Sequence, residues 1–313
     1  MTKRAMGNLV NRYRSVLKKC HLINTFGSLA VAAILVMGVT DGEAFSNAVG
    51  YNVTSTSTPG TTVSVTDTSE NAVASGIKAE TSATYSVPST ITRAEATAIG
   101  KQSALSLGVF AQSSSGNRLT VNLAPLDISS TAVTENGSSR SVGIYSDVNS
   151  SVSVHGGTIV SSAHSKNGIA EAFGAMSQNN SSVTLGADSI VLSAESSKKL
   201  SDPRTVGIYF SDNSTFNVTS NRIRVDVSAT HNGDVFSRKV NGIYGDKNST
   251  LSMNDADISV REINSTPDKS GAAGIRIDPG DEGCLHPRSS RRSRGHFCGL
   301  CNRHRHQSNQ WQA

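Results

Sequence analysis

A repeat of about 32 residues runs through the middle of the chain and constrains its fold more than any other feature. Segments that begin with glycine and a small or apolar residue recur at spacings of 31, 33, 35 and 32 residues. They are Gly143-Ile-Tyr, Gly174-Ala-Met, Gly207-Ile-Tyr, Gly242-Ile-Tyr and Gly274-Ile-Arg. Weaker copies begin at Gly76 and Gly108. Self-similarity at such a period is typical of solenoids, in which each repeat stacks on its neighbours.

Other positions recur when they are counted from each glycine. Offset six holds an asparagine followed by two Ser/Thr residues, namely Asn149, Asn180, Asn213 and Asn248. Offsets nine and eleven are apolar: Val152 and Val154, Val183 and Leu185, Phe216 and Val218, Leu251 and Met253. Offset sixteen holds Ile159, Ile190, Ile223 and Ile258, and offset eighteen holds Ser161, Leu192, Val225 and Val260. Since side chains two apart lie on one face of a strand, each pair predicts a short strand with an inward face.

These offsets predict an all-β solenoid with three strands in each coil. The residues between the apolar pairs are Ser153, Thr184, Asn217 and Ser252, and we expect them to face water. The glycine segment supplies the third strand, in which glycine allows close approach of the neighbouring backbone. Stacking at about 4.8 Å buries the inward faces and satisfies the backbone hydrogen bonds. The repeats cover residues 76–279, and residues 45–75 are expected to form a strand-rich or capping segment.

Two features of the turns and loops remain open. The asparagines at offset six either stack into an amide ladder or serve as ordinary turn residues. Three stretches vary in length and carry much of the charge of the body: Ala163 to Ala172, Ser193 to Thr205 and Ala229 to Lys239. We interpret these stretches as loops at one corner of the coil, where binding specificity would lie.

The first 44 residues are expected to form a secretory signal peptide with an extended basic region. Residues 1–24 are basic and polar, and the apolar run from Leu29 to Gly38 follows. Small-x-small sites stand at 42–44 and 46–48. The apolar run is too short for a membrane span, which needs about 20 residues. The alternative, a buried core helix, would be amphipathic instead of charged first and apolar afterwards.

The net charge of +5 does not indicate a nucleic-acid partner. Its basic residues gather in the leader and in the tail after residue 284, whereas the body has no basic stripe and aromatic residues make up only 5% of the chain. Such a body lacks both the cationic footprint and the stacking platform that nucleic-acid binders use.

The leader, the Ser/Thr/Asn-rich body and the three-strand repeat together resemble autotransporter passengers of the pertactin-like and adhesin type. The resemblance implies a right-handed parallel β-helix, carried to the outer membrane or beyond by a C-terminal β-barrel translocator. It also implies a non-catalytic surface or secreted role, with a host surface or other bacterial cells as partners through loops of the solenoid. The only expected association with a membrane is through that translocator, for which the chain shows no strand pattern. The expected location is then the periplasm.

The pattern ends near residue 280. Gly280 replaces the asparagine and Gly283 the apolar residue, and residues 280–313 are rich in Arg, His and Cys. Cys298-x-x-Cys301 with His304 and His306 suggests a zinc site, although the His-x-His spacing is not standard. A capping segment is a second interpretation. The favoured one is a shift of reading frame that truncates a longer passenger before its translocator.

No residue is singled out as catalytic, cofactor-binding or metal-binding, and no cofactor is expected. The alternative to a binding role is a β-helical polysaccharide lyase, which needs clustered acids for calcium. The acids near one repeat position are Asp147, Asp212, Asp246 and Asp278. Aspartate is more often a turn former at such positions. A further alternative is a non-functional product of an interrupted gene.

Overall fold

The computed structural model describes residues 47–55, 59–114, 117–186, 190–198, 204–219, 223–231, 240–246, 248–253, 256–264 and 272–277. The expected signal peptide of residues 1–44 and the tail of residues 280–313, with its cysteines and histidines, lie outside these residues. The described part contains no helix that is long and apolar enough to cross a membrane.

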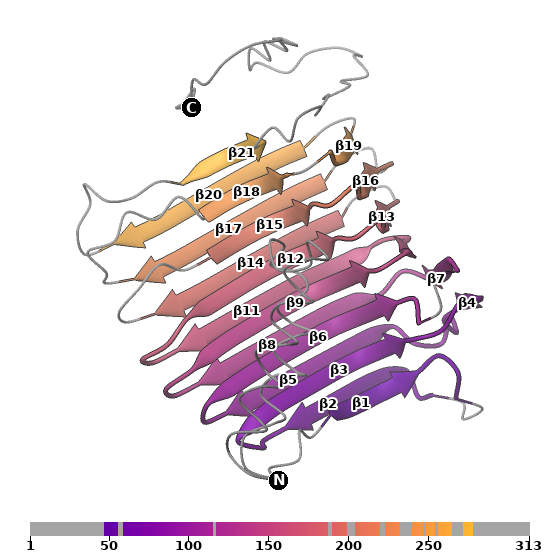
Figure 1. Ribbon diagram of the computed structural model, residues 1–313, viewed down its shortest axis with the longest axis horizontal. Helices are drawn as coiled ribbons and strands as arrows, with labels where there is room; N and C mark the ends of the chain where they lie inside the picture. Colours follow the sequence, from indigo (N-terminus) through magenta and orange to yellow (C-terminus); the bar gives the residue numbers. More distant parts are fainter. Residues whose placement is uncertain are drawn as a thin grey trace, which may run out of the picture. The chain divides into compact units, whose positions relative to one another are not determined.

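The described strands form three parallel sheets, which we call A, B and C, and the chain visits them in the order A, C, B in each complete coil (Figure 1). Sheet A contains β1 (Asn47–Asn52), β3 (Asn71–Ala79), β6 (Ser103–Gln112), β9 (Ser138–Asp147), β12 (Ala170–Ser177), β15 (Arg204–Phe210), β18 (Val240–Gly245) and β21 (Ala273–Ile277). Sheet B contains β2 (Thr62–Asp67), β5 (Arg93–Gly100), β8 (Asp127–Thr134), β11 (Gly157–Ser165), β14 (Ile190–Lys198), β17 (Ile223–His231) and β20 (Ala256–Asn264). Sheet C contains β4 (Thr84–Ser86), β7 (Leu119–Leu123), β10 (Ser150–Val154), β13 (Ser182–Leu185), β16 (Thr215–Val218) and β19 (Thr250–Met253). The predicted parallel solenoid is therefore confirmed.

The predicted register is confirmed in sheets A and C. Val152, Val183, Phe216 and Leu251 pair in succession, as do the residues two positions later in each strand. In sheet A the residue after the repeated glycine pairs from coil to coil, and its side chain joins the main core. β1 pairs with β3 in the same register, so the repeated columns extend back to Gly50.

The register predicted for sheet B is wrong by two residues at two of its interfaces and right between them. Ile159 pairs with Leu192 instead of Ile190, and Ile258 pairs with Val225 instead of Ile223. Between β14 and β17 the predicted pairs Ile190–Ile223 and Leu192–Val225 are confirmed. Two residues separate β10 from β11, whereas four separate β13 from β14. A shift of two residues does not change the face of a strand, because its side-chain period is two, and Ile223 and Val225 of β17 lie in the core as predicted.

The three predicted loops are shorter than expected. Strand β11 runs to Ser165 and β12 begins at Ala170, which leaves only residues 166–169 between them. Strands β14 and β17 likewise extend to Lys198 and His231. The loops were predicted too long because small residues in them did not indicate strands. Alanines in fact fill the narrow wedge between sheets A and B. These are Ala72, Ala74, Ala96, Ala98, Ala104, Ala132, Ala163, Ala170 and Ala172.

Buried serines bridge the same wedge. The Ser130 hydroxyl donates to Ser106 Oγ at 3.0 Å, Ser141 donates to Ser130 Oγ at 2.8 Å, and Ser161 donates to Ser141 Oγ at 2.9 Å. This chain of hydroxyls alternates between sheets A and B, and all four serines are buried. The polar side chains at these inward positions therefore form hydrogen bonds inside the coil, as buried hydroxyl groups generally do.

The turn interpretation explains the asparagines at offset six. Asn149, Asn180, Asn213 and Asn248 have φ between 53° and 59°, the left-handed region that asparagine tolerates better than most residues. An amide contact between coils occurs at a different corner, where Asn167 Nδ2 donates to Asn136 Oδ1 at 2.9 Å.

Candidate binding surface on the outer face of sheet A

The repeated glycine bends each strand of sheet A and places apolar residues on both of its faces. Ser141 points inward, where it bonds to Ser130, whereas Arg140 pairs with Glu171 outside. Ile144 returns to the main core, but Val142 and Tyr145 belong to a separate cluster. A Cβ on Gly143 would meet the Ile159 side chain inside the coil. Gly143 and Ile144 therefore both face inward, and the residues on either side of them meet outside.

These outward residues form a continuous apolar strip across five strands, which we call the sheet A strip. Its buried members are Leu107, Phe110, Val142, Tyr145, Phe173, Met176, Val206 and Tyr209. Leu105 and Tyr244 are partly buried and pack against it. Val142, Phe173 and Val206 each keep only 1% of their surface exposed. An outer face of this kind acts as a second core.

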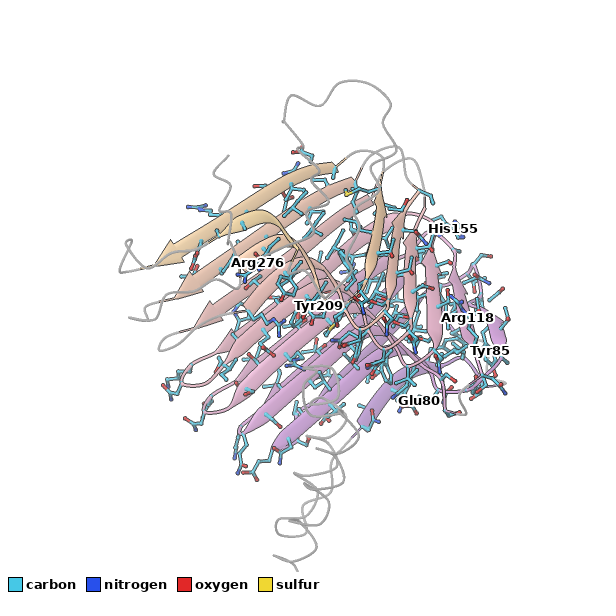
Figure 2. The ribbon with its side chains drawn as sticks, turned by 45° about the horizontal axis from the view of Figure 1, so that its top comes forward. Glu80, Tyr85, Arg118, His155, Tyr209 and Arg276 are labelled. Atoms are coloured by element: carbon cyan, nitrogen blue, oxygen red, sulfur yellow. The ribbon has the colours of Figure 1, made fainter. Side chains whose placement is uncertain are left out.

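Two tyrosines and two arginines contact one another at the C-terminal end of the strip, whereas Phe110 and Tyr145 lie 5.6 Å apart at its other end. Tyr209 and Tyr244 stack at 5.4 Å with 9° between their planes, and Tyr209 meets Phe173 edge-on at 5.7 Å. The guanidinium of Arg204 lies 5.0 Å from the Tyr209 ring, and that of Arg276 lies 5.8 Å from the Tyr244 ring. Figure 2 shows Tyr209 and Arg276 over the broad sheets, away from the edge that carries Tyr85, Arg118 and His155. We call Tyr209, Tyr244, Arg204 and Arg276 the Tyr/Arg cluster.

The Tyr/Arg cluster includes partly exposed side chains of this face, although its Tyr209 is only 3% exposed. Arg204, Tyr244 and Arg276 are partly exposed, unlike the middle of the strip. Asn241 lies in the same strand as Tyr244, one residue before the repeated glycine, and is 2% exposed. Its Oδ1 has no hydrogen-bond partner, and an unsatisfied buried acceptor of this kind calls for an explanation. Guanidinium groups beside tyrosine rings suit a partner that carries anionic groups.

A hydrogen-bonded polar group borders the other end of the strip. The Tyr145 hydroxyl donates to Asp147 Oδ2 at 2.9 Å, and Asn179 Nδ2 donates to Asp147 Oδ1 at 2.6 Å. Burial raises the pKa of Asp147, and the charge of Asp212 raises it further, although hydrogen bonds from Asn179, Tyr145 and the Val148 N–H oppose the shift. Burial and Asp147 together raise the pKa of Tyr145 well above its ordinary value. Both groups hold the turn together.

The acids named from the sequence serve mainly as turn residues. Asp212 has a φ of 57° in the left-handed region, whereas Asp147 is held by its neighbours. Asp246 bonds through its backbone N–H to the Phe210 carbonyl, and Asp278 lies outside the described residues. Among the described residues, no three His, Cys, Asp or Glu side chains gather closely enough to hold a metal ion.

Sequence reasoning missed the sheet A strip, although its signal is present. The residues one before and two after each repeated glycine are mostly large and apolar: Leu107 and Phe110, Val142 and Tyr145, Phe173 and Met176, Val206 and Tyr209. A spacing of three does not match a single strand face, so only a bend at the glycine reveals that these residues meet.

No protein-family model matches the chain, and neither a search of curated proteins nor a search of solved structures finds a similar protein. The function must therefore be argued from the coil and from the chemistry of its surfaces.

Proposed function

We propose that this chain is an exported, passenger-like β-solenoid of the autotransporter type that acts by binding and not by catalysis. The observation that carries the proposal is the contact of two tyrosines with two arginines at the C-terminal end of the outer face of sheet A, on a stack of parallel strands. Tyrosine and arginine are enriched at the contact points of protein interfaces. The expected partner is a molecule on a host surface or on another bacterial cell.

The Tyr/Arg cluster is the contact point that we assign to this partner. Its two arginines lie over tyrosine rings. Guanidinium groups recognise carboxylate and sulfate groups. Acidic glycans and acidic peptides both present these groups, and the assay distinguishes them.

The binding role is tested with the purified chain on epithelial cells, on bacterial cells and on an array of acidic glycans and peptides. We expect saturable binding that Tyr244→Ala weakens at least about tenfold, the usual scale for a central aromatic contact. Thr184→Ala, on the outer face of sheet C, is the matched control and leaves binding unchanged. Equal binding by the two variants, or no saturable binding to any target, would contradict the proposal. A calcium-dependent release of unsaturated sugars would favour the lyase alternative instead.

Export is tested by N-terminal sequencing of the chain recovered from the periplasm. Of the two small-x-small sites, cleavage after Ala44 leaves β1 whole, whereas cleavage after Ala48 removes its first two residues. We therefore expect the mature chain to begin at Phe45. A chain that stays in the cytoplasm with its leader attached would refute the export part of the proposal.

A further inference from the structure

A chain of hydrogen bonds joins two aspartates at the corner where sheet A turns into sheet C. The Tyr145 hydroxyl lies 2.9 Å from Asp147 Oδ2 and 3.3 Å from Gln178 Oε1. Gln178 Nε2 donates to Ser211 Oγ at 3.0 Å, and the Ser211 hydroxyl donates to Asp212 Oδ2 at 2.9 Å. The chain therefore crosses the turns that follow β9, β12 and β15.

All members of this chain except Asp212 are shielded from water. Gln178 is 0% exposed, and Asp147 and Ser211 are each 1% exposed. Tyr145 is buried as well, whereas Asp212 is partly exposed. A buried polar group without a hydrogen-bond partner destabilises a fold. The stability of the corner therefore depends on how many hydrogen atoms the chain has to share.

The chain has one hydrogen atom too few when both aspartates are ionised. The single hydroxyl hydrogen of Tyr145 points either to Asp147 or to Gln178 and does not serve both fully. An ionised Asp147 attracts this hydrogen, and Gln178 Oε1 then has no donor in the chain. A protonated Asp147 instead donates to Tyr145, which donates to Gln178. All the bonds then run in one direction and end at an ionised Asp212.

Asp147 also holds the backbone of the corner. Its Oδ1 accepts a hydrogen bond from the Val148 N–H at 2.9 Å and another from Asn179 Nδ2 at 2.6 Å. Val148 has a φ of 41°, in the left-handed region that β-branched residues rarely adopt. The Asn149 N–H donates to the Asn179 carbonyl of the next coil at 3.0 Å. The carboxyl group of Asp147 therefore connects the turns of two coils beside a strained residue.

The charges around the corner favour a proton on Asp147. The titratable groups around Asp147 and Tyr145, on the elements packed against them, are Asp212, Arg140, Glu171 and Tyr209. Arg140 is paired with Glu171, and across the sheet in β6 the neighbour of Asp147 is the uncharged Gln112. Burial and the charge of Asp212 both raise the pKa of Asp147, in agreement with the direction of the hydrogen bonds.

We propose that this corner is a proton-dependent lock: one proton on Asp147 completes the chain to Asp212, and its loss loosens the turns between sheets A and C. When the pH rises, Asp147 gives its proton to water, and the Tyr145 hydrogen turns from Gln178 to Asp147. The buried Gln178 then lacks a donor in the chain, and both aspartates are negative. Because the folded form holds this proton more tightly than the unfolded chain does, the contribution of the lock is complete in acid and is lost as the pH rises through the folded pKa. This inference needs only the solenoid and does not depend on the proposed binding role.

Carboxyl NMR of the full chain with isotope-labelled aspartate follows the proton directly. The Asp147 signal is the one that disappears in Asp147→Asn. We expect Asp147 to keep its proton to at least about one pH unit above the ordinary value for aspartate, a tenfold difference in proton affinity. Asp212→Asn should move this titration back towards the ordinary value, because it removes the neighbouring charge. Asparagine suits the left-handed conformation of residue 212, so this variant should keep the turn.

Hydrogen exchange then measures the lock itself. Exchange of the backbone amides in residues 146–151 and 178–182 is compared between the wild type and Asp147→Asn at each pH, so that the intrinsic effect of pH on exchange cancels. Asparagine at this position carries no charge and keeps a donor for Tyr145, so it imitates the locked state. We expect equal exchange at about pH 4 and at least about tenfold faster exchange of the wild type at about pH 7. Asp226→Asn, on the outer face of sheet B, is the matched control and should exchange like the wild type at every pH.

Three results would each overturn the proposal. The first is an Asp147 carboxyl group that titrates in the ordinary range of aspartate. The second is a ratio of exchange rates between the wild type and Asp147→Asn that does not change with pH. The third is a titration of Asp147 that Asp212→Asn leaves unchanged.

Discussion

Sheets A and B come from the same coils, yet their outer faces have opposite character. Outward valines of sheet A, such as Val142 and Val206, are 1% exposed, whereas Val160 and Ile99 on the outside of sheet B are 41% and 44% exposed. The strands of both sheets stack in parallel, so the stacking does not cause the difference. Side chains one residue before and two residues after the repeated glycine meet outside sheet A. Burial in this solenoid thus depends on the shape of the coil as well as on alternation.

Phe173 gives the strongest test of the difference between the outer faces of sheets A and B. Because this ring is buried on the outside of sheet A, Phe173→Ala should lower the free energy of unfolding by about 3 to 5 kcal/mol, as for an ordinary core phenylalanine. Val160→Ala on the outside of sheet B should cost no more than about 0.5 kcal/mol. Urea denaturation of both variants measures the difference. Similar small losses would show that the sheet A strip is not a second core.

The role of the bend is tested at the glycine itself. Gly143→Ala places a methyl group against Ile159 and the Gly174 carbonyl, so overpacking should cost about 1 to 3 kcal/mol. Gly274→Ala has no atoms to meet and serves as the control, with no loss expected in dilute solution. Thermal unfolding of the two proteins gives the comparison. A tolerated alanine at position 143 would remove the structural reason for the glycine repeat.

A smaller effect is expected in the wedge between the two sheets. Ser141 donates to Ser130 and accepts from Ser161 and from the Ser162 N–H, so Ser141→Ala leaves buried polar groups unsatisfied. The expected loss is about 1 kcal/mol, the lower end for an unsatisfied buried group, because the Ser130 hydroxyl still bonds to Ser106. The outward serine of sheet C, Ser153→Ala, should change stability by no more than about 0.5 kcal/mol. Equal losses in chemical denaturation would argue against a buried hydroxyl chain.

The smallest effect concerns pH at the border of the sheet A strip. The pKa of Asp147 is raised in the folded protein, so its stabilising contribution is complete below the unfolded value of about 4 and is lost as the pH rises through the folded pKa. Asp147→Asn removes this ionisation. The wild type should therefore gain stability relative to the variant as the pH falls from 7 towards about 4. A difference that stays constant over this range would show that Asp147 does not titrate with a raised pKa.

Much of this fold could be predicted, because the features that repeat in the sequence are those that stack. The apolar pairs of sheet C and the glycine strand of sheet A appear at fixed offsets, and their partners pair as expected. The predicted register of sheet B was shifted because two residues precede some of its strands and four precede others. Offsets counted from one glycine do not show where these extra residues lie. A shift of two residues leaves the face of a strand unchanged, so Ile159, Ile223 and Val225 still lie in the core.

The candidate surface was harder to predict than the fold. Strands rich in Ala and Ser look like polar loops until the wedge between the sheets is known, as at Ala163 and Ala170. The Tyr/Arg cluster depends on a bend that no single strand reveals, and Arg204 and Arg276 meet tyrosines from neighbouring coils. The unsatisfied acceptor of Asn241 is visible only when its surroundings are known.

Disulfide trapping in sheet B tests the stacked-coil account most directly. In a background without the four natural cysteines, Val160→Cys is combined either with Ser193→Cys, its partner in the sheet, or with Val191→Cys, its partner if the repeats aligned by offset. Paired residues of neighbouring strands lie about 4.8 Å apart, whereas a shift of two residues adds about 6.6 Å along the strand. The second pair then lies beyond the reach of about 7 Å that a disulfide allows. The account predicts that only the 160–193 pair closes upon oxidation, and closure of the 160–191 pair instead would contradict it.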